Sequence, residues 1–333
     1  MEFTTGGRFE VRITPADVGK RVSVRRVIDT SGMAEKFTDT VGVLTSWADG
    51  VLRITRRTGE TIPVDEATVV AGKVVPPTPT RRRVPATNAE ELDRVAARGW
   101  PPVESERLGG WQLRAAAGFT RRANSVLPLG DPGVPLDAAL RHVTQWYAAR
   151  GLPPYIQVSE GTLGAGRRLT AALAERGWHA EVAALIRIGA LAPLADTGAD
   201  LSPVALTRTP GEDWLRRYGR AARRGPEALR VLCGGPSVWF ATVPGEPGEA
   251  PAAIGRCVVD GRWAGFTAVE VDPGRRRRGL ASLVLAALAD KALGEGASAA
   301  YLEVEEENEG AHALYDRLGF VTHHRYDHWR GPV

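Results

Sequence analysis

The stretch Phe266–Phe320 decides the fold; it reads FTAVEVDPGRRRRGLASLVLAALADKALGEGASAAYLEVEEENEGAHALYDRLGF. The β-rich segment at 264–271 ends at an Asp-Pro-Gly turn, which predicts a strand followed by a change of chain direction. The apolar run at 279–293 has the length and spacing of a buried helix. A short strand at 300–304 and a helix at 309–318 follow. The predicted order is therefore strand, basic glycine turn, helix, strand, helix.

The turn between the first strand and the first helix carries four consecutive arginines, Arg275–Arg278, followed by Gly279. A glycine loop that opens a helix directs unpaired backbone N–H groups and the positive end of the helix dipole at one point, which suits a phosphate. The segment lacks the Gly-Lys-Ser/Thr of a P-loop, and its glycines do not form G-x-G-x-x-G. The alternative interpretation is a solvated basic turn that binds nothing.

The spacing Arg276-x-x-Gly279-x-Ala281, after Val-x-Pro and before a helix, resembles the pyrophosphate loop of the GNAT superfamily, the GCN5-related N-acetyltransferases. The segment LEVEEENEGAHALYDRLGF is similar to the strand, asparagine loop and tyrosine helix of that family. The resemblance covers about 201–330 and uses two separated motifs in the right order. It implies an α/β fold with a mixed, mostly antiparallel sheet, and an N-acetyltransferase that uses acetyl-CoA.

The resemblance also implies where the cofactor binds. A splay between the strands at 264–271 and 300–304 would admit the pantetheine arm of acetyl-CoA, which Asn308 would hold. The implied cofactor-binding residues are Val269, Val271, Arg276, Arg277, Arg278, Gly279, Leu280, Ala281, Ser282, Asn308, Ala311 and Tyr315.

Two residues of this segment are candidates for proton transfer. An amine that attacks a thioester must lose a proton, and the departing thiolate must gain one. Glu303 and Tyr315 lie twelve residues apart, a spacing that resembles the base and acid pair of protein N-terminal acetyltransferases. By that resemblance Glu303 takes the amine proton, through water, and Tyr315 protonates the CoA sulfur. Glu270 is the competing base. The alternatives are that Glu303 belongs to a solvated acidic run and that Tyr315 only packs under the sheet.

The acceptor stays open at this point. The Glu303–Tyr315 spacing favours a primary amine of a protein or peptide, attacked directly in a ternary complex. The alternatives are a small-molecule amine, such as an aminoglycoside, and a non-catalytic regulator that binds acyl-CoA. Because early helices line the acceptor site in the family, Trp214 and Tyr218 of a predicted helix at 213–224 are candidate substrate contacts; the alternative for both is core packing.

Composition bounds the remaining possibilities. With 333 residues and 43% apolar content the chain can form two or three domains. Its net charge of +4 suits an acidic ligand. Its richness in Arg, Ala and Gly is, however, typical of a GC-rich bacterium such as an actinomycete, which weakens an inference to nucleic acid.

Cys233 and Cys257 lack ligand spacing and suit a reducing compartment. Without a long apolar run or a signal peptide, we expect a cytoplasmic protein that does not enter a membrane. Oligomeric state is not predicted.

Residues 1–75 form a separate unit of short β-branched runs, at 22–28, 40–44, 51–55 and 61–64. Five short strands favour a small closed barrel, and the pattern resembles the SH3-like barrels fused to some actinobacterial acetyltransferases. Its arginines suggest a basic face for nucleic acid, but an ordinary charged surface or a docking module is favoured; they are Arg25, Arg26, Arg53, Arg56 and Arg57. A Pro- and Arg-rich linker is predicted at 76–87.

A repeat relates the middle of the chain to its end. Gly-Phe-Thr at 118–120 precedes Tyr-Ile-Gln-Val by 37 residues, and Gly-Phe-Thr at 265–267 precedes Tyr-Leu-Glu-Val by 36. We interpret this as two GNAT-like halves in tandem, a degenerate first half at 88–197 and a catalytic second half at 198–333; the alternative is chance similarity.

The first half lacks the arginine loop and has Gln157 in place of Glu303, so we expect it to shape the acceptor cleft instead of binding CoA. Its polar cluster either faces that cleft or caps a turn; the cluster consists of Arg121, Arg122, Asn124 and Ser125.

The C-terminal tail contains His323, His324, Asp327 and His328. A metal site needs ligands that converge, whereas adjacent histidines on a strand point to opposite faces. We therefore predict no metal site, and expect the tail to form a closing β-hairpin.

Overall fold

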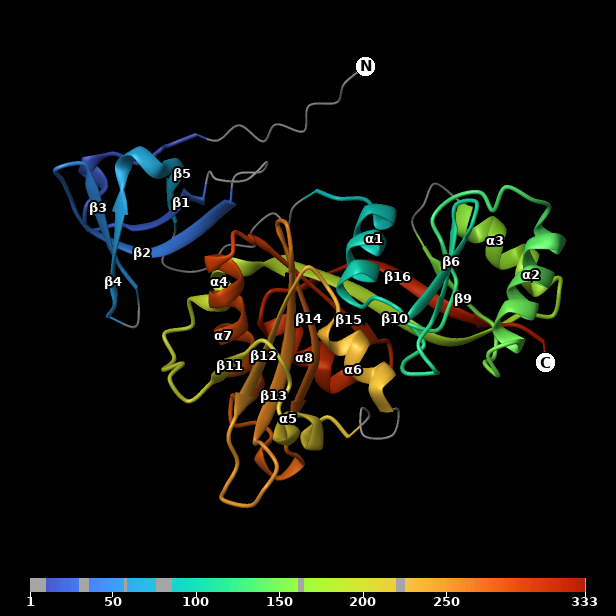
Figure 1. The fold of residues 1–333 in the computed structure, drawn as a ribbon. Helices are drawn as coiled ribbons and strands as arrows, with labels where there is room; N and C mark the ends of the chain where they lie inside the picture. The colour runs from blue at the N-terminus through green and yellow to red at the C-terminus, as the bar shows by residue number, and fades with distance from the viewer. Residues whose placement is uncertain are drawn as a thin grey trace.

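The computed structural model describes residues 10–29, 36–56, 59–75, 86–160, 165–219 and 225–332 (Figure 1). The strands are β1 (Arg21–Asp29), β2 (Lys36–Ala48), β3 (Val51–Thr55), β4 (Thr61–Asp65), β5 (Val69–Val74), β6 (Glu104–Leu108), β7 (Trp111–Ala115), β8 (Leu127–Pro128), β9 (Tyr155–Ser159), β10 (His179–Ala190), β11 (Ala205–Thr207), β12 (Ser237–Val243), β13 (Ala253–Asp260), β14 (Trp263–Val271), β15 (Ala299–Glu305) and β16 (Val321–Arg330). The α-helices are α1 (Ala89–Gly99), α2 (Leu136–Ala148), α3 (Ala165–Ala174), α4 (Leu191–Ala195), α5 (Glu212–Arg217), α6 (Gly225–Cys233), α7 (Leu280–Gly294) and α8 (Glu309–Arg317).

The N-terminal sheet, β1–β5, contains the four predicted strands and one that the prediction did not locate, β5. Its order is β4-β3-β2-β1-β5, and Val22, Leu44, Leu52 and Ile54 form its core. A closed barrel requires the two edge strands to pair with each other, but β4 and β5 do not pair within the described residues. The closed SH3-like barrel is therefore not confirmed. Arg57 and most of the predicted linker, residues 76–85, lie outside the described residues.

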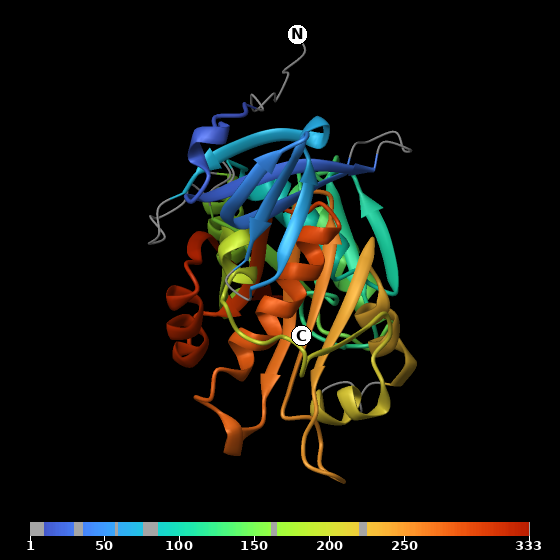
Figure 2. The same cartoon turned by 90° about the vertical axis from the view of Figure 1, so that its left-hand side faces the viewer.

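The N-terminal sheet is docked against α4 and α7 (Figure 2). Val41 and Val75 belong to the same apolar cluster as Leu288 and Leu293 of α7. At Gly296 a Cβ atom would lie 2.5 Å from the carbonyl oxygen of Phe37, so the contact needs a glycine. The sheet is thus part of the main structure and not a tethered module.

The main sheet has eight strands in the order β11-β12-β13-β14-β15-β10-β16-β9. Within it only β14 and β15 run parallel; the other neighbours are antiparallel, which confirms the predicted mixed α/β sheet. Helix α7 lies on β12–β14 and buries Val284, Leu285 and Leu288. Its sequence is apolar on nearly every side because helix α4 and strand β2 cover the face that the main sheet does not.

The two halves exchange their last strands (Figure 1). Strand β10 of the first half lies between β15 and β16, and β9 pairs with β16. The register is symmetric: Ile186 faces Glu303 as His328 faces Gln157, about an axis through the pair Ala184–Tyr326. The predicted division at 197/198 therefore does not coincide with a break in the sheet. It also means that β16 is a central strand and does not form the expected closing hairpin.

A bulge in β16 alters the expected directions of two histidines. The register shifts so that Ile186 pairs with His324 and Arg187 with Thr322, which leaves His323 as the extra residue. The Nδ1 atoms of His323 and His324 lie 2.7 Å apart, so these side chains do not point to opposite faces as predicted. His324 contacts α1: its Nε2 atom lies 3.1 Å from Oδ1 of Asp93. No group of three or more metal-binding side chains converges in the described part of the chain.

Candidate functional site

The site begins where β14 and β15 separate. They pair from Trp263 and Ala299 as far as Phe266 and Leu302, although both strands continue beyond that point. At the separation β14 carries a bulge: Ala268 has φ +51°, and two residues of β14 oppose Gly255 of β13. A bulge bends and twists its strand, which explains the divergence. The predicted splay is therefore present, and Val269 and Glu270 lie on its edge.

The arginine loop, residues 272–279, connects this edge to α7. Gly279 is the N-cap of α7 with φ +78°, a conformation that favours glycine. Asp272 accepts a hydrogen bond of 2.9 Å from the backbone N–H of Gly274 and forms an ion pair with Arg217. The loop thus turns into the helix and leaves the first N–H groups of α7, at Leu280, Ala281 and Ser282, without partners within the helix.

The four arginines of the loop divide into two kinds. Arg275 is held by Glu249 at 2.8 Å and by Glu246 at 3.5 Å. The other three, Arg276–Arg278, are exposed and form no ion pair with any described residue. Unpaired guanidinium groups around a helix N-terminus attract phosphate oxygens, so this arrangement fits a pyrophosphate.

Replacing Arg276, Arg277 and Arg278 together by Ala is expected to weaken CoA binding by roughly 10²-fold, because each lost charge-assisted contact costs about 1.5–3 kcal/mol when fully formed and less when exposed. Calorimetric titration with CoA at two salt concentrations measures the effect, which high salt should reduce. The control is Arg53→Ala, an exposed arginine of the N-terminal sheet. Equal CoA affinity in the triple variant and the parent would contradict the assignment.

Glu303 does not belong to a solvated run. Its side chain is 6% exposed, whereas Glu305, Glu306 and Glu307 are exposed. The hydroxyl of Tyr326 donates a 2.6 Å hydrogen bond to Glu303 Oε2, and Arg122 Nη1 lies 3.0 Å from Oε1. Burial on its own lowers the pKa of Arg122, but the Glu303 carboxylate outweighs it and raises that pKa. Burial and the same carboxylate raise the pKa of the Tyr326 hydroxyl well above its ordinary value.

Tyr315 is buried on α8 and packs edge-on against Phe320, with ring centroids 5.6 Å apart. Burial raises the pKa of its hydroxyl to about 12, an effect that Arg187 partly offsets. Among the described residues none hydrogen-bonds to this hydroxyl. Asn308 caps α8 by accepting a 3.1 Å hydrogen bond from the N–H of Ala311, which leaves its amide nitrogen to donate elsewhere.

A cavity of about 640 Å³ opens beside Glu303. We call it the Glu303 cavity; Gly118, Phe119, Thr120, Arg121, Arg122, Val182, Ala184, Arg217, Gly219, Glu270, Glu303, Val304, Glu305, Tyr326 and His328 line it. Both candidate bases, Glu303 and Glu270, therefore face one space. The first half supplies a wall of this cavity, as the sequence predicts for a half that shapes a cleft.

The comparisons with known proteins agree with this geometry. A family model described as "Probable histone acetyltransferase Rv0428c C-terminal" matches residues 87–329. The chain belongs to this family of GNAT acetyltransferases. It is 29% identical over 308 residues to "Probable histone acetyltransferase Rv0428c" of Mycobacterium tuberculosis, and the match covers 92% of this chain and 93% of that protein.

Solved structures share the fold of this GNAT protein. A GCN5-related N-acetyltransferase from Kribbella flavida has a TM-score of 0.53 at 18% identity, and the match covers 74% of this chain and 96% of that chain. A tandem GNAT protein from the clavulanic acid biosynthesis pathway has a TM-score of 0.51 at 17% identity, with 76% and 90% covered. At these identities the likeness concerns the fold alone.

The polar cluster of the GNAT protein's first half serves both predicted purposes. Arg121 and Arg122 line the Glu303 cavity, whereas Asn124 caps the loop that carries them. Its side-chain oxygen accepts from two backbone N–H groups, at 2.8 and 2.9 Å, and its nitrogen donates to two carbonyls, at 2.9 and 2.8 Å. Ser125 is buried and accepts a hydrogen bond of 2.9 Å from Arg114. The two arginines therefore project from a loop with a determined conformation.

The predicted substrate contacts Trp214 and Tyr218 lie in the core of the GNAT protein. Trp214 is 1% exposed, packs edge-on against Phe240 at 5.1 Å, and directs its indole N–H to the Gly255 carbonyl at 3.4 Å. Tyr218 is also buried and packs against Phe119, which lines the Glu303 cavity. The two residues support the cavity wall from behind. The helix that carries Trp214 ends at Arg217, earlier than predicted, and residues 220–224 lie outside the described residues.

Replacing Trp214 by Ala is expected to lower the free energy of unfolding by about 3–5 kcal/mol, because the substitution leaves a large cavity in the core. Chemical denaturation followed by circular dichroism measures this loss. Trp214→Phe, which keeps an aromatic ring, should leave the KM for the acceptor unchanged. A raised acceptor KM in Trp214→Phe with normal stability would instead support a substrate contact.

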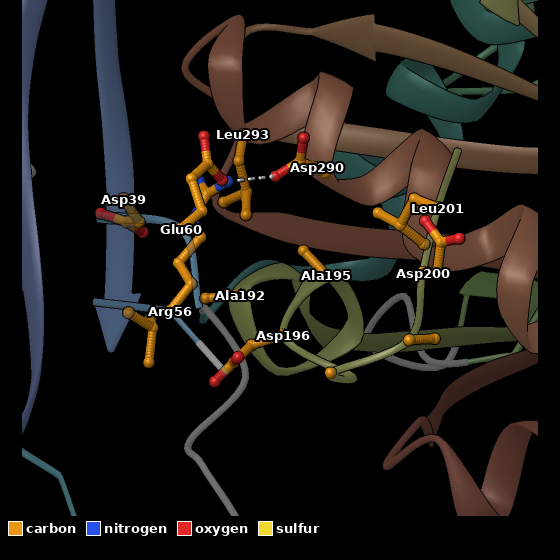
Figure 3. Close-up of a pocket in the computed structure, with 13 residues that line it drawn as sticks. Asp39, Arg56, Glu60, Ala192, Ala195, Asp196, Asp200, Leu201, Asp290 and Leu293 are labelled. Carbon is orange, nitrogen blue, oxygen red and sulfur yellow. Dashed lines mark hydrogen bonds and ion pairs between the residues drawn. The ribbon is translucent and has the colours of Figure 1, made fainter. Parts of the chain in front are cut away.

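A second cavity of about 630 Å³ lies between the N-terminal sheet and helices α4 and α7 (Figure 3). Its carboxylates are largely paired: Asp196 with Arg21, Asp39 with Arg25 at 2.8 Å, and Asp290 with Arg56 at 3.3 Å. Of the arginines predicted for a nucleic-acid face, Arg56 thus pairs across the docked interface, whereas Arg25 pairs within the N-terminal sheet. This cavity shares no lining residue with the Glu303 cavity.

No helix in the described ranges is long and apolar enough to cross a membrane.

Tyr326 and His328 line the Glu303 cavity, although the sequence did not single out Tyr326 and suggested His328 only as a candidate metal ligand. Arg122 stood out as part of a polar cluster, but nothing in the sequence connected it to Glu303. Tyr326 follows Glu303 by 23 residues and reaches it across β10, a distance at which local spacing carries no signal.

Proposed function

We propose that this protein transfers the acetyl group of acetyl-CoA to a primary amine by direct attack in a ternary complex. The observation that carries the proposal is the buried carboxylate of Glu303. It lines a cavity beside the point where strands β14 and β15 separate. A base, an acceptor space and a cofactor opening therefore meet at one place.

The described residues fit acetyl-CoA. The unpaired arginines of the arginine loop and the N-terminus of α7 suit its pyrophosphate, and the splay beside Val269 and Val271 suits its extended arm. Asn308 and Ala311 lie at the start of α8, from which Tyr315 also comes. When bound, acetyl-CoA supplies the acetyl group as a thioester.

The protein's own residues then move two protons. Glu303 is held in place by Tyr326 and Arg122 and accepts the proton that the amine must lose, directly or through water. Glu270, which lines the same cavity, is the second candidate for this role. The hydroxyl of Tyr315 stays protonated at neutral pH because burial raises its pKa to about 12, so it can donate to the departing sulfur.

Direct attack by the amine is supported by the raised pKa of both cysteine thiols. A thiol acts as a nucleophile when its pKa is lowered, but burial raises the pKa of both Cys233 and Cys257. Cys257 is fully buried in the core, and neither lines the Glu303 cavity. An acetyl-cysteine intermediate is therefore not part of the proposal.

Two classes of acceptor are supported by different observations. A protein or peptide amine is supported by the name of the mycobacterial relative, a probable histone acetyltransferase, and by the Glu303–Tyr315 spacing. A small amine is supported by the Glu303 cavity itself, because the loop at 118–122 closes one side of it. We keep the peptide amine first and treat the small amine as the second candidate.

The test is to incubate the purified protein with acetyl-CoA and a panel of peptides and small amines while free thiol is measured. Thiol release that depends on the amine, with an acetylated product in mass spectrometry, would support the transferase and identify its acceptor class. Tight CoA binding without release on any amine would contradict it and favour an acyl-CoA-binding regulator.

A further inference from the structure

Charges of both signs line the Glu303 cavity. Its three carboxylates, Glu270, Glu303 and Glu305, come from β14 and β15. Of its three arginines, Arg121 and Arg122 come from the loop of the first half, and Arg217, which is paired with Asp272, comes from α5. A cavity for a polycationic acceptor would be predominantly acidic, whereas three carboxylates and three guanidinium groups line this one. An acceptor that carries both charges is complementary to it.

Arg121 is the less engaged of the two loop arginines. Its guanidinium lies 3.5 Å from Glu181, a loose ion pair, and 5.8 Å from the ring centroid of Tyr155. Its side chain is 41% exposed. Arg122, in contrast, is committed to Glu303. Arg121 is therefore the cation of this cavity that can turn toward a ligand.

His328 lines the same cavity and has no hydrogen-bond partner among the described residues. The residue is 3% exposed, and both ring nitrogens are buried and unpaired. A neutral imidazole has one donor and one acceptor, and an unsatisfied buried polar atom costs about 1–3 kcal/mol. Native structures seldom leave such atoms unpaired without a reason. Because His328 lines the cavity, a ligand group there can satisfy it.

The surroundings of His328 determine which ligand group fits. Tyr155 and Tyr326 pack edge-on against its ring at centroid distances of 6.4 and 5.4 Å, which restricts its orientation. Burial, together with the positive charges of the nearby Arg114, Arg121 and Arg122, lowers the pKa of His328 to about 3. The imidazole is thus neutral at physiological pH and stands in a positive field. A carboxylate can accept its N–H hydrogen bond and also balance that field.

We propose that the acceptor carries a carboxylate a short distance from its amine, with the amine toward Glu303 and the carboxylate toward His328 and Arg121. This inference rests on the proposed function and specifies its substrate. His328 is a specificity-determining residue in this scheme and takes no proton. The shared chemistry, an ammonium and a carboxylate close together, occurs in a free amino acid and in a peptide whose N-terminal residues are acidic.

The experiment uses matched acceptors with the full-length protein. Free α-amino acids are compared with their carboxamides, and peptides with Asp or Glu in the first two positions with their Asn or Gln counterparts. For the preferred source, kcat/KM should be roughly tenfold to a hundredfold higher with the carboxylate, through KM, as expected of a charge-assisted hydrogen bond. The source that shows the difference identifies the acceptor.

Two variants connect the preference to the named residues. His328→Phe removes both nitrogens and keeps an aromatic ring, and Arg121→Met removes the charge from an exposed side chain, so that at least the second is expected to fold. Either should bring the carboxylate-to-amide ratio of kcat/KM toward one, with the Kd for CoA unchanged. The control is His142→Phe, a partly exposed histidine of α2 that is paired with Glu106 and lies outside the Glu303 cavity.

The outcomes separate this inference from the proposed function. If amides and carboxylates react with equal kcat/KM, or if the ratio persists in both variants, the carboxylate assignment is overturned while the acetyltransferase stands. If no acceptor releases thiol although CoA binds, the proposed function fails, and this inference with it.

Discussion

Replacing Tyr315 by Phe is expected to lower kcat by about 10²–10³ while the Kd for acetyl-CoA stays within about twofold. The hydroxyl is the only group removed, and the ring that packs against Phe320 remains, so the fold should be retained. Steady-state thiol release gives kcat, and calorimetry gives the Kd. An unchanged kcat would remove Tyr315 from the mechanism and leave it as a core residue under the sheet.

The matched control for this substitution is Tyr301→Phe. Tyr301 is also buried, and burial raises the pKa of its hydroxyl as well, but it lies where β15 still pairs with β14, before the two strands separate. Loss of its hydroxyl should leave kcat within about twofold. A similar fall in both variants would indicate a general effect on the sheet and not proton donation by Tyr315.

The pH profile provides an independent check on Tyr315. Because burial raises the pKa of its hydroxyl to about 12, the neutral, proton-donating form persists as the pH rises through 10. Deprotonation of Tyr315 should therefore cause no fall in kcat between about pH 7 and 10. An alkaline limb in that range that disappears in Tyr315→Phe would contradict this assignment.

Replacing Glu303 by Gln is expected to lower kcat/KM by about 10²–10⁴, the range for loss of a general base. The amide oxygen can still accept the hydrogen bond from Tyr326, but the side chain cannot take a proton. Arg122 also loses its counter-ion. A quarter of its side chain is exposed, so the loss of stability should stay below the roughly 3–5 kcal/mol of a fully buried pair.

Glu270→Gln is the comparison that decides between the two bases. Both carboxylates line the Glu303 cavity, so both variants alter its charge equally. If Glu303 is the base, Glu270→Gln should change kcat/KM by less than about tenfold. The reverse order, with the larger loss in Glu270→Gln at normal stability, would transfer the role to Glu270.

The sequence alone determined the local architecture of the second half. The strand–loop–helix–strand–helix order at 264–318 agrees with β14, α7, β15 and α8, because turn residues and apolar periodicity act over a few residues. The arginine run with Gly279 likewise predicted a glycine loop that opens a helix, and in the structure Gly279 is the N-cap of α7. The repeat, in which Gln157 takes the place of Glu303, was predicted from the sequence for the same reason.

Only the tertiary structure decided what surrounds Glu303. The exchange of β10 and β16 places Tyr326 on its carboxylate and His328 in the cavity, and the loop of the first half adds Arg122. The pairing of β10 with β16 also produces the bulge at His323. Trp214 is buried because the core packs around it. A strand's own residues show that it pairs, but its partner depends on which distant strand buries the most apolar surface with it. A single sequence does not contain that comparison.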